Sequence, residues 1–446
     1  MTAGETLLAT RLLRLVATHL RGGSLTVVDG EGTHRFGGGL PAVTMVVHDP
    51  SVYPAVLRTG SVGLAQTYAD GLWDCDDLTT LIRVLSRGLR PVTAVQDRVG
   101  QWIGSATDWA RHLRPPDKRT DRHNIRAHYD LSNEFFGLML DETMMYSSAI
   151  FERSGMSLAD AQRAKLDQMC SKLGLGPSDH VMEIGTGWGG FAVHAAEHYG
   201  CRVTTTTISD AQYQYACKRV ADAGLADRVT VLNEDYRDLS GRYDKLVSIE
   251  MIEAVDWRHH DTFFGTCARL LRPDGLMALQ AITVDDRSYE RAKNGTDFVR
   301  KLIFPGGCIP SVEAITRSLR RATPLALVDL EDIGRHYAET LRRWHENVES
   351  HRPEVAALGL DTRFQRLWDL YLCYCEGAFL ERHISDVQMV MAMPGWEAPV
   401  AVRRGRVPLL HRGEFRGAER GAPFLGDRTD GARLPVGPDG RDPAVR

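Results

Sequence analysis

Two acidic residues, Glu250 and Glu253, follow an apolar run at 246–249 in the segment LVSIEMIEAVD. If this run is a strand of a parallel sheet, it ends on the side where such sheets usually bind ligands. Two acids in a pocket of low dielectric constant cannot both ionise cheaply, so one of them is expected to have a raised pKa. If a helical turn begins at Glu250, the three-residue spacing places both carboxylates on one face. The alternative is a solvated loop or helix start, because acids suit a helix N-terminus.

The second candidate site is the glycine-rich turn VMEIGTGWGGF, with glycines at 185, 187, 189 and 190 between a strand-like run and a helical one. Glycine lets the backbone approach a cofactor closely, and a helix N-terminus offers amide donors. The next strand-like run ends in TTTTISDAQ, without the acid that usually binds the ribose of NAD. Asp235, after the third run, suits an adenine amino group. These features favour S-adenosylmethionine over NAD or a turn without ligand.

The elements that position these residues alternate regularly from about residue 178. Helical segments separate five strand-like runs, HVMEI, CRVTTTT, RVTVL, DKLVSI and GLMALQAI. This pattern predicts an α/β fold in which a mostly parallel sheet is covered by helices on both faces. Two later runs, PLALVDLEDI and DVQMVMAMP, are expected to complete the sheet, and a helical insertion rich in aromatic residues lies between them.

The rest of the chain divides by composition. Residues 1–105 mix short strand-like and helical runs, which predicts a small α+β domain. Residues 106–125 read as a basic linker that contains Pro115 and Pro116. Residues 126–400 contain the alternating pattern. Residues 401–446 are rich in Arg, Gly, Pro and Asp and are expected to be disordered.

The composition of the 446 residues excludes several classes of protein. Hydrophobic residues make up 43% and the net charge is −4, so nothing draws the whole chain to nucleic acid. The eight cysteines are scattered without a C-x-x-C pair, and no metal site is expected. No secretory signal pattern and no apolar stretch of about 18 residues occurs, so we expect a cytoplasmic protein that does not span a membrane.

Five motifs occur in an order typical of one enzyme family. They are HYDLSNEFFGLMLDETMMYSSAIFE (128–152), EIGTGWGG (183–190), SIEMIEAV (248–255), KLIFPGGCIPS (301–311) and YLCYCEGAF (371–379). Together they resemble the cyclopropane-fatty-acyl-phospholipid synthase family of S-adenosylmethionine-dependent lipid methyltransferases. The segment YADGLWDCDDL (68–78) resembles the extra N-terminal domain of the bacterial phospholipid-acting members. The resemblance extends over about residues 55–395.

The resemblance implies a class I methyltransferase fold over residues 126–400, Rossmann-like with a mostly parallel seven-stranded sheet. It implies methyl transfer to the cis double bond of an unsaturated, oleoyl-type phospholipid acyl chain. Helices within 126–150 and 285–380 would line a tunnel for that chain. The residues that would contact the cofactor are Tyr146, Ser147, Gly185, Gly187, Gly189, Thr206, Thr207, Gln212, Asp235 and Tyr236.

The catalytic pattern of the family is only partly present. In the ring-forming relatives a bicarbonate ion acts as the base, held by a Cys, a Glu, a His, an Ile backbone and a Tyr. Glu253, Ile282 and Tyr337 match this set, whereas Ser148 stands at the Cys position and Gln280 at the His position. In addition, the family's SxGMFEH motif has Glu250 in place of its Gly and Ala254 in place of its His.

These departures predict that Glu250 is an internal base that replaces bicarbonate and decides the product, while Glu253 and Tyr337 support the transition state. The resemblance is therefore closest to the branch that makes 10-methylene, tuberculostearic-type fatty acids. A cyclopropane synthase is the alternative. Two further alternatives are a lipid- and S-adenosylmethionine-binding protein without catalysis and an NAD oxidoreductase.

An insoluble lipid substrate implies work at a membrane surface. The protein is expected to be peripheral at the inner face of the membrane, with the basic segment 111–126 and the N-terminal domain as docking elements. Further candidate partners are a second copy of the chain and a reductase that acts on the methylene product.

Overall fold

The structure is a computed structural model that describes residues 3–88, 131–295 and 297–398. The predicted linker at 106–125, the basic segment 111–126 and the predicted tail at 401–446 lie outside the described residues. The division into domains therefore stays a prediction.

The N-terminal residues build a four-stranded sheet in the order β2-β1-β3-β4. Leu25 and Val27 in β1 and Val43 and Met45 in β3 are buried, so the period-two pattern of both strands turns one face of the sheet into the core. The strands are β1 (Gly23–Asp29), β2 (Gly32–Gly38), β3 (Ala42–Val47) and β4 (Trp73–Cys75). The helices are α1 (Ala3–Ala17), α2 (Val52–Thr59), α3 (Ser61–Ala69) and a helical segment at 78–88.

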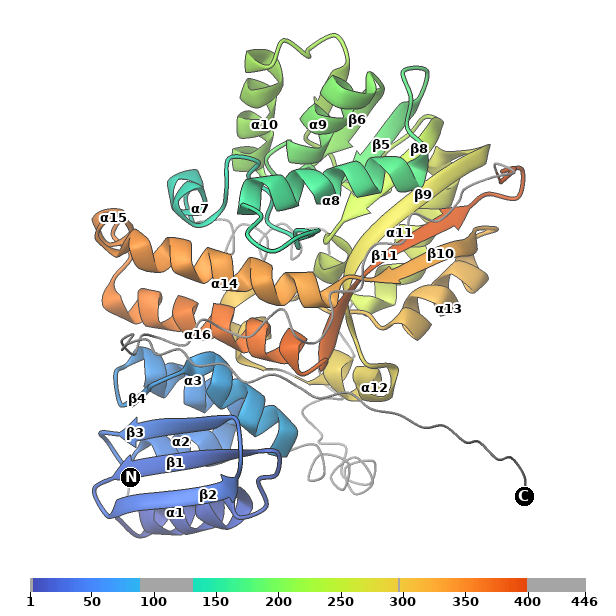
Figure 1. The fold of residues 1–446 in the computed structure, drawn as a ribbon. Coiled ribbons are helices and arrows are strands. Elements are labelled where there is room, and N and C mark those ends of the chain that lie inside the picture. The colour runs from blue at the N-terminus through green and yellow to red at the C-terminus, as the bar shows by residue number, and fades with distance from the viewer. Residues whose placement is uncertain (1–2, 89–130, 296, 399–446) are drawn as a thin grey trace, which may run out of the picture. The chain divides into compact units, whose positions relative to one another are not determined.

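A second sheet has seven strands in the order β10-β11-β9-β8-β5-β6-β7 (Figure 1). Strands β5 to β9 run parallel, and β11 lies antiparallel between β9 and β10. Each of the seven runs predicted from the sequence is a strand, which confirms the α/β class and the mostly parallel sheet. The strands are β5 (His180–Ile184), β6 (Arg202–Thr206), β7 (Val229–Leu232), β8 (Tyr243–Ile249), β9 (Leu271–Val284), β10 (Ala326–Asp332) and β11 (Ile384–Ala392).

Helices cover both faces of this sheet. Leu246 and Val247, neighbours in β8, belong to two different buried clusters, because successive side chains of a strand point to opposite faces. One cluster includes α8 (Leu158–Leu173) and α9 (Gly190–Tyr199), and the other includes α11 (His260–Leu270) and α13 (Val312–Ala322). Helix α10 (Asp210–Asp222) packs beside β7. Strand β8 lies between β5 and β9, so the residues after it emerge at the middle of the sheet.

The insertion between β10 and β11 is helical, as predicted. It consists of α14 (Gly334–Ser350), α15 (Arg352–Ala357) and α16 (Thr362–Leu380). Helices α14 and α16 pack along each other below the large sheet in the view of Figure 1. Their core is aromatic: Trp344 and Trp368 are buried, and the Trp368 ring lies 5.2 Å from that of Phe135 in α7 (Asn133–Met139). Two further helical elements are α12 (Asp286–Asn294) and a π-helical turn, Val299–Ile303.

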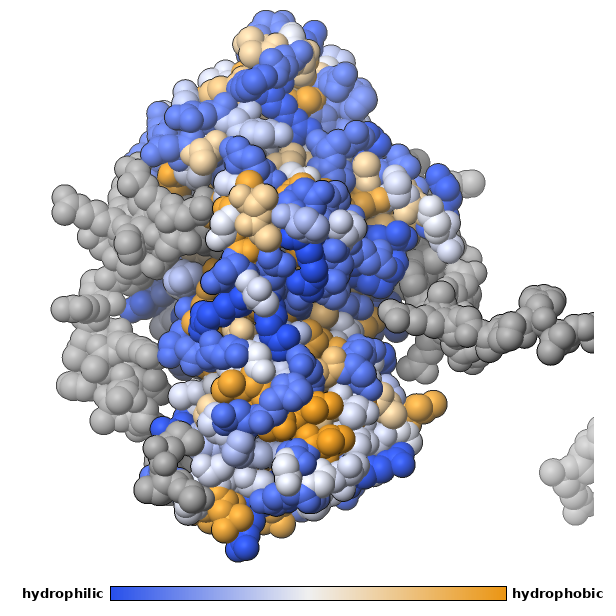
Figure 2. Space-filling view, turned by 90° about the vertical axis from the view of Figure 1, so that its left-hand side faces the viewer, coloured by the Kyte–Doolittle hydropathy of each residue, from blue (hydrophilic) through white to orange (hydrophobic). Residues whose placement is uncertain are grey.

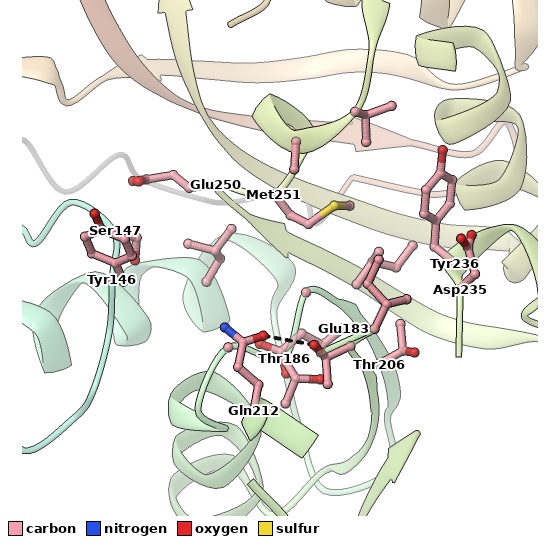
Figure 3. A pocket seen from close by; sticks show the side chains of 18 of the residues that line it. Tyr146, Ser147, Glu183, Thr186, Thr206, Gln212, Asp235, Tyr236, Glu250 and Met251 are labelled. Carbon is pink, nitrogen blue, oxygen red and sulfur yellow. Dashed lines mark hydrogen bonds between the residues drawn. The ribbon is translucent and has the colours of Figure 1, made fainter. Parts of the chain in front are cut away.

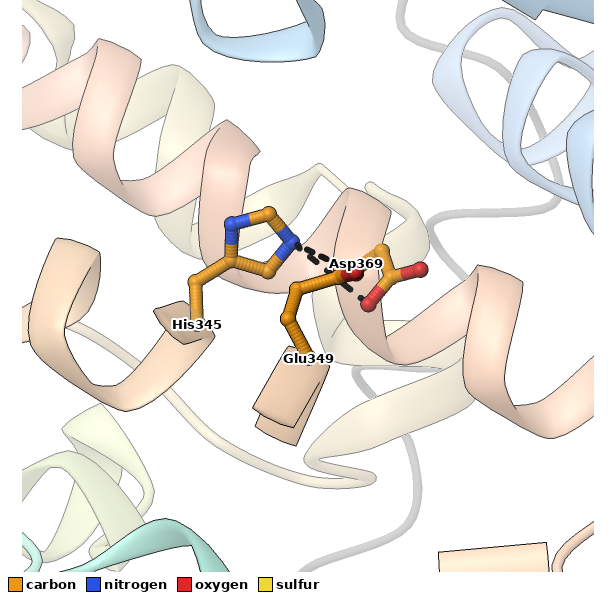
Figure 4. A group of neighbouring side chains, drawn as sticks. All are labelled: His345, Glu349 and Asp369. Atoms are coloured by element: carbon orange, nitrogen blue, oxygen red, sulfur yellow. Dashed lines mark ion pairs between the residues drawn. The ribbon is translucent and has the colours of Figure 1, made fainter. Parts of the chain in front are cut away.

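An ion cluster ties α14, α15 and α16 together, and we call it the His345 cluster: His345, Glu349, Arg352 and Asp369. Nε2 of His345 lies 3.5 Å from Oε1 of Glu349 and 3.5 Å from Oδ1 of Asp369 (Figure 4). The Arg352 guanidinium contacts both carboxylates and is 2.6 Å from Oδ2 of Asp369. Burial opposes the charge on His345, but Asp369 and Cys373 raise its pKa to about 11. Two carboxylates are thus balanced by two cations.

Polar contacts also join the N-terminal segment to α16. Glu381 accepts hydrogen bonds from Arg83 at 2.9 Å and from Arg87 at 2.7 Å. Arg366 of α16 donates to Asp74 at 2.8 Å and to the carbonyl of Tyr68 at 2.6 Å. These charge-assisted bonds anchor the four-stranded sheet beside the helical insertion.

Candidate active site

The glycine-rich turn connects β5 to α9. Gly185 and Gly187 have φ angles of 104° and 50°, a region that favours glycine. A Cβ on Gly185 would lie 3.0 Å from Met251, whereas a Cβ on Gly187 would meet no atom within 4 Å. The backbone at Gly187 is therefore open to close approach by a ligand.

A cavity of about 1200 Å³, including the solvent at its mouth, opens beside this turn. Figure 3 shows Asp235 and Tyr236 at one end of the cavity and Tyr146, Ser147 and Glu250 at the other. Among the predicted site residues, the lining includes Tyr146, Ser147, Gly185, Gly187, Thr206, Thr207, Gln212, Asp235, Tyr236 and Glu250.

Gly189 lies outside this lining, so the structure does not bring it together with the other predicted cofactor residues. It precedes α9 with a φ of 81°, and a Cβ there would lie 3.3 Å from Cβ of Ala216 in α10. Gly189 therefore lets two helices pack closely.

The Asp235 end of the cavity is polar and held by its own hydrogen bonds. Asp235 is buried, and Arg237 orients its carboxylate through bonds of 2.8 Å and 2.7 Å. The Thr207 hydroxyl donates to Oε1 of Gln212 at 2.9 Å, and the Thr206 hydroxyl donates to the Glu234 carbonyl at 2.6 Å. A fixed carboxylate beside an open glycine turn suits the adenosine part of S-adenosylmethionine.

Among the residues that line the cavity, two buried polar residues were missed by the sequence analysis, Glu183 and Thr186. Glu183 accepts a hydrogen bond from Thr205 at 2.6 Å, and the hydroxyls of Thr186 and Thr205 are 2.7 Å apart. Burial raises the pKa of Glu183 to about 8. The sequence did contain a signal for Glu183, because it is an acid two positions before the first glycine of the turn.

Glu250 directly follows β8 and has a φ of 48°, which is uncommon for a residue other than glycine. Its backbone amide donates to the Gln280 carbonyl at 2.8 Å. Oε1 of its side chain accepts from the Ser148 amide at 2.8 Å and from Nε2 of Gln280 at 2.7 Å. Oε2 accepts from the Tyr337 hydroxyl at 2.6 Å. Three donors from three distant segments thus hold one carboxylate at the cavity wall.

Glu253 lies in a 3₁₀ turn, Ile252–Ala254, behind Glu250. Because this turn begins two residues after Glu250, the prediction that both acids share one face of a turn starting at Glu250 is wrong. Oε1 of Glu253 accepts from the Ile282 amide at 2.5 Å, and Oε2 is buried without a hydrogen-bond partner in the part of the chain that the structure describes. Burial and the charge of Glu250 raise the pKa of Glu253 to about 8, which confirms the expected raised pKa of one acid.

Two more ionisable groups beside Glu250 were missed by the sequence analysis. Lys165 of α8 is fully buried, and its Nζ donates to the Ser147 hydroxyl at 2.6 Å. Burial lowers the pKa of Lys165 to about 8, against the charge of Glu250. Asp386 of β11 is also fully buried, and its Oδ2 accepts from Nε2 of Gln280 at 3.0 Å. No local sequence pattern marks either residue.

Comparisons with known proteins agree with this geometry. The family model of mycolic acid cyclopropane synthetase matches residues 116–389. Tuberculostearic acid methyltransferase UfaA1 of Mycobacterium tuberculosis (strain ATCC 25618 / H37Rv) is 37% identical over 404 residues, 89% of this chain and 93% of the relative. Cyclopropane-fatty-acyl-phospholipid synthase of Escherichia coli (strain K12) is 36% identical over 347 residues, 78% of this chain and 87% of the relative.

A solved structure gives the same result for the fold. Mycolic acid cyclopropane synthase CmaA1, in complex with SAH and CTAB, matches with a TM-score of 0.57 and 31% identity, over 63% of this chain and 99% of that chain. This confirms the class I methyltransferase fold predicted from the sequence. With the family model spanning most of the large sheet and its helices, the chain belongs to the mycolic acid cyclopropane synthetase family.

Proposed function

We propose that the protein transfers a methyl group from S-adenosylmethionine to the cis double bond of an oleoyl-type phospholipid acyl chain and forms a 10-methylene product. S-adenosylmethionine-dependent modification of unsaturated lipid acyl chains is the activity of the family to which the chain belongs. The name of UfaA1, a tuberculostearic acid methyltransferase, supports the 10-methylene branch.

The observation that carries the choice of product is the set of partners of Glu250. The resemblance assigns the bicarbonate ligands of ring-forming relatives to positions 148, 253, 280, 282 and 337 of this chain. Glu250 accepts hydrogen bonds from three of these positions, Ser148, Gln280 and Tyr337. This supports a role for the Glu250 carboxylate as an attached base that replaces the bicarbonate ion.

The chemistry needs such a base. S-adenosylmethionine supplies an electrophilic methyl group to the alkene. The methylated acyl chain carries a positive charge, and after a hydride shift a proton must leave the new methyl group to give the methylene. Glu250 accepts that proton at a carboxylate oxygen. The position of the base relative to the cation decides between ring closure and methylene formation.

Aromatic side chains beside Glu250 suit an acyl chain and a transient cation. The Tyr146 ring lies 5.3 Å from Phe136 and 5.2 Å from Trp344, and the Tyr337 ring stacks on Phe379 at 4.5 Å. Aromatic faces attract positive charge, and apolar walls exclude the water that would capture a cation. These contacts support the proposal that segments 126–150 and 285–380 bind the acyl chain.

The test of the base is Glu250→Gly, which also removes the strain of the positive φ. Cells that contain oleate and produce each variant are analysed by gas chromatography of their fatty esters. We expect the methylene product to fall about 10²–10⁴-fold, the usual loss for a missing general base. Adding Ser148→Cys and Gln280→His, with bicarbonate, should divert product toward cyclopropane. Glu253→Gln is the control and should depress every product equally. An unchanged rate and product in Glu250→Gly would contradict the proposal.

The competing function is cyclopropane synthesis, which the retained Glu253, Ile282 and Tyr337 favour. Both reactions add one CH₂ to the acyl chain, so mass alone does not separate the products. Chromatographic retention and the proton resonances of an exocyclic methylene distinguish them. Binding of S-adenosylmethionine without any product would instead indicate a protein that has lost catalysis.

Cofactor binding is tested at Gly187. A valine there would place its side chain in the cavity, so calorimetry should show the loss of S-adenosylmethionine binding. Gly224→Val is the matched control, because Gly224 has a φ of 68° and is likewise open around its Cβ. Both variants carry the same backbone strain, and only the first should lose the ligand. Equal affinity in the two variants would remove the glycine turn from the site.

We place the protein peripherally at the inner face of the membrane. In the described residues no helix has the length and hydrophobicity to cross a bilayer. Helix α1 exposes Leu7, Leu8, Leu12, Leu15 and Val16, and Figure 2 shows hydrophobic residues on the surface of the N-terminal part, low in the view. An apolar helix face supports contact with a lipid surface.

Flotation with anionic liposomes tests this placement, and Leu8→Glu with Leu15→Glu should reduce binding. Leu358→Glu, at an exposed leucine outside the N-terminal segment, is the control. Equal flotation of all three proteins would contradict a role for α1. The second copy of the chain and the reductase stay predictions.

A further inference from the structure

Asp386 has no counterpart among the residues that the family resemblance assigns, yet its carboxyl group is buried beside the proposed base. It lies in β11 opposite Ile282 of β9 and has no exposed surface. Nε2 of Gln280 donates to Oδ2 of Asp386 at 3.0 Å and to Oε1 of Glu250 at 2.7 Å. One amide nitrogen therefore bridges two carboxyl groups.

A relay of glutamines fixes the orientation of this amide. The Glu331 carboxylate, an acceptor only, binds Nε2 of Gln168 at 2.8 Å, and Gln168 donates to Oε1 of Gln388 at 2.9 Å. Gln388 then donates to Oε1 of Gln280 at 3.1 Å. Because the oxygen of Gln280 is engaged on that side, its nitrogen must face Glu250 and Asp386.

The hydrogen bonds of the two carboxyl groups are unequal. Glu250 accepts from three donors, which is the environment of a charged carboxylate. Asp386 has one donor at Oδ2, and its buried Oδ1 has no hydrogen-bond partner among the described residues. An unpaired oxygen of a buried carboxylate would be costly, whereas a protonated carboxyl group can donate to a neighbouring acceptor.

The charges around Asp386 also favour its protonated form. The groups that act on it are Glu250, Glu253 and Lys165. Burial raises the pKa of Asp386 well above its ordinary value, and the charge and hydrogen-bonding contact of Glu250 raise it further. Lys165 opposes this effect and does not reverse it.

We propose that Asp386 is a positioning residue for Glu250: its neutral carboxyl group donates a hydrogen bond to the Glu250 carboxylate and holds it, charged, at the cavity wall. This inference rests on the proposed role of Glu250 as the base. A neutral acid beside a charged one keeps the second carboxylate fixed without adding like-charge repulsion.

Two substitutions distinguish a role of Asp386 as hydrogen-bond donor from a role in packing alone. Asp386→Asn keeps a donor for Glu250 and an acceptor for Gln280, whereas Asp386→Leu keeps about the same volume without polar atoms. We expect kcat to stay within about threefold for the first variant and to fall roughly 10- to 100-fold for the second, the loss expected for one hydrogen bond to a charged group. KM for the lipid should be unchanged in both. Ser385→Ala, whose hydroxyl bonds to Asp332, is the control in the same strand and should leave kcat unchanged.

The pH profile of kcat distinguishes this role from packing. In the wild type, loss of the Asp386 proton at high pH would set a second negative charge against Glu250 and lower the rate. Glu253 and Lys165 titrate in both proteins, so the comparison of wild type with Asp386→Asn isolates Asp386. We expect the alkaline fall to be weaker in Asp386→Asn. If Asp386→Leu does not fold, the pH profiles of wild type and Asp386→Asn still distinguish the proposed role from packing.

An infrared difference spectrum provides a readout that is independent of activity. Subtracting Asp386→Asn from wild type at neutral pH should reveal the carbonyl band of one protonated carboxyl group. Absence of that band, or an Asp386→Asn variant as slow as Asp386→Leu with an unchanged pH profile, would overturn the inference. If the band and the kinetic contrast appear but the product is a cyclopropane, the proposed function fails and the assignment of Asp386 stands.

Discussion

Helix α14 contacts two clusters of acids, through His345 and Glu349 in one and through Tyr337 in the other, and the clusters differ in their balance of charge. In the His345 cluster, Glu349 and Asp369 face Arg352 and a His345 whose pKa is raised to about 11. We call the second group the Glu250 cluster: Glu250, Glu253, Asp386 and Lys165. Lys165 is the one cation among the groups that act on Asp386. The first arrangement stabilises the helices, because each charge has a partner. In the second, burial raises the pKa of Glu253 to about 8 and that of Asp386 well above its ordinary value, and such perturbed acids are typical of sites selected for chemistry.

The sharpest test of this difference is Glu250→Gln, which keeps the shape of the side chain and removes its charge. We expect single-turnover formation of the methylene product to slow about 10²–10⁴-fold. The free energy of unfolding should be unchanged or higher, because the change removes a partly buried charge. Stopped assays and urea unfolding measure the two quantities. A variant that keeps its rate but loses stability would place Glu250 in the structural class with Asp369.

The opposite outcome is expected for Asp369→Asn. This change leaves Arg352 and His345 without one of their two acids, so the free energy of unfolding should fall by about 3 kcal/mol. The rate per folded enzyme should not change. Asp329→Asn is the control at a partly exposed ion pair with Lys172, and it should cost less than about 1 kcal/mol. If Asp369→Asn were slower but as stable as wild type, the His345 cluster would have a role in the reaction and not in stability.

The smallest effect concerns pH. The pKa of His345 is raised from its ordinary value of 6.5 to about 11, so its protonated form is favoured by folding. Its contribution to stability is fully present below pH 6.5 and decreases as the pH rises toward 11. The difference in unfolding free energy between wild type and His345→Gln should therefore shrink from pH 6.5 upward, which urea titrations at several pH values can measure. A difference that grows with pH would show that His345 is neutral in the folded protein.

The two clusters also mark the limit of what the sequence could predict. The strands, the helical insertion and the glycine turn depend on local patterns, and those predictions are confirmed. Ser148, Gln280 and Tyr337 were placed by family resemblance, because no local pattern predicts that they meet at Glu250. Lys165 and Asp386 were missed, since they come close to Glu250 only through the packing of α8 and β11 in the folded protein. The prediction that Glu250 and Glu253 share one face of a turn was wrong, because the left-handed backbone at Glu250 delays the start of the helical turn to Ile252.

That left-handed backbone has a consequence at the level of the genetic code. A φ of 48° is a conformation that glycine adopts without strain, and glycine is the residue that the ring-forming pattern has at position 250. Two of the glycine codons become glutamate codons when their second base changes from G to A. Glycine and glutamate at position 250 are therefore a single nucleotide substitution apart. The backbone needs no rearrangement for this exchange, whereas the Cys and His of the ring-forming pattern at positions 148 and 280 would require separate substitutions.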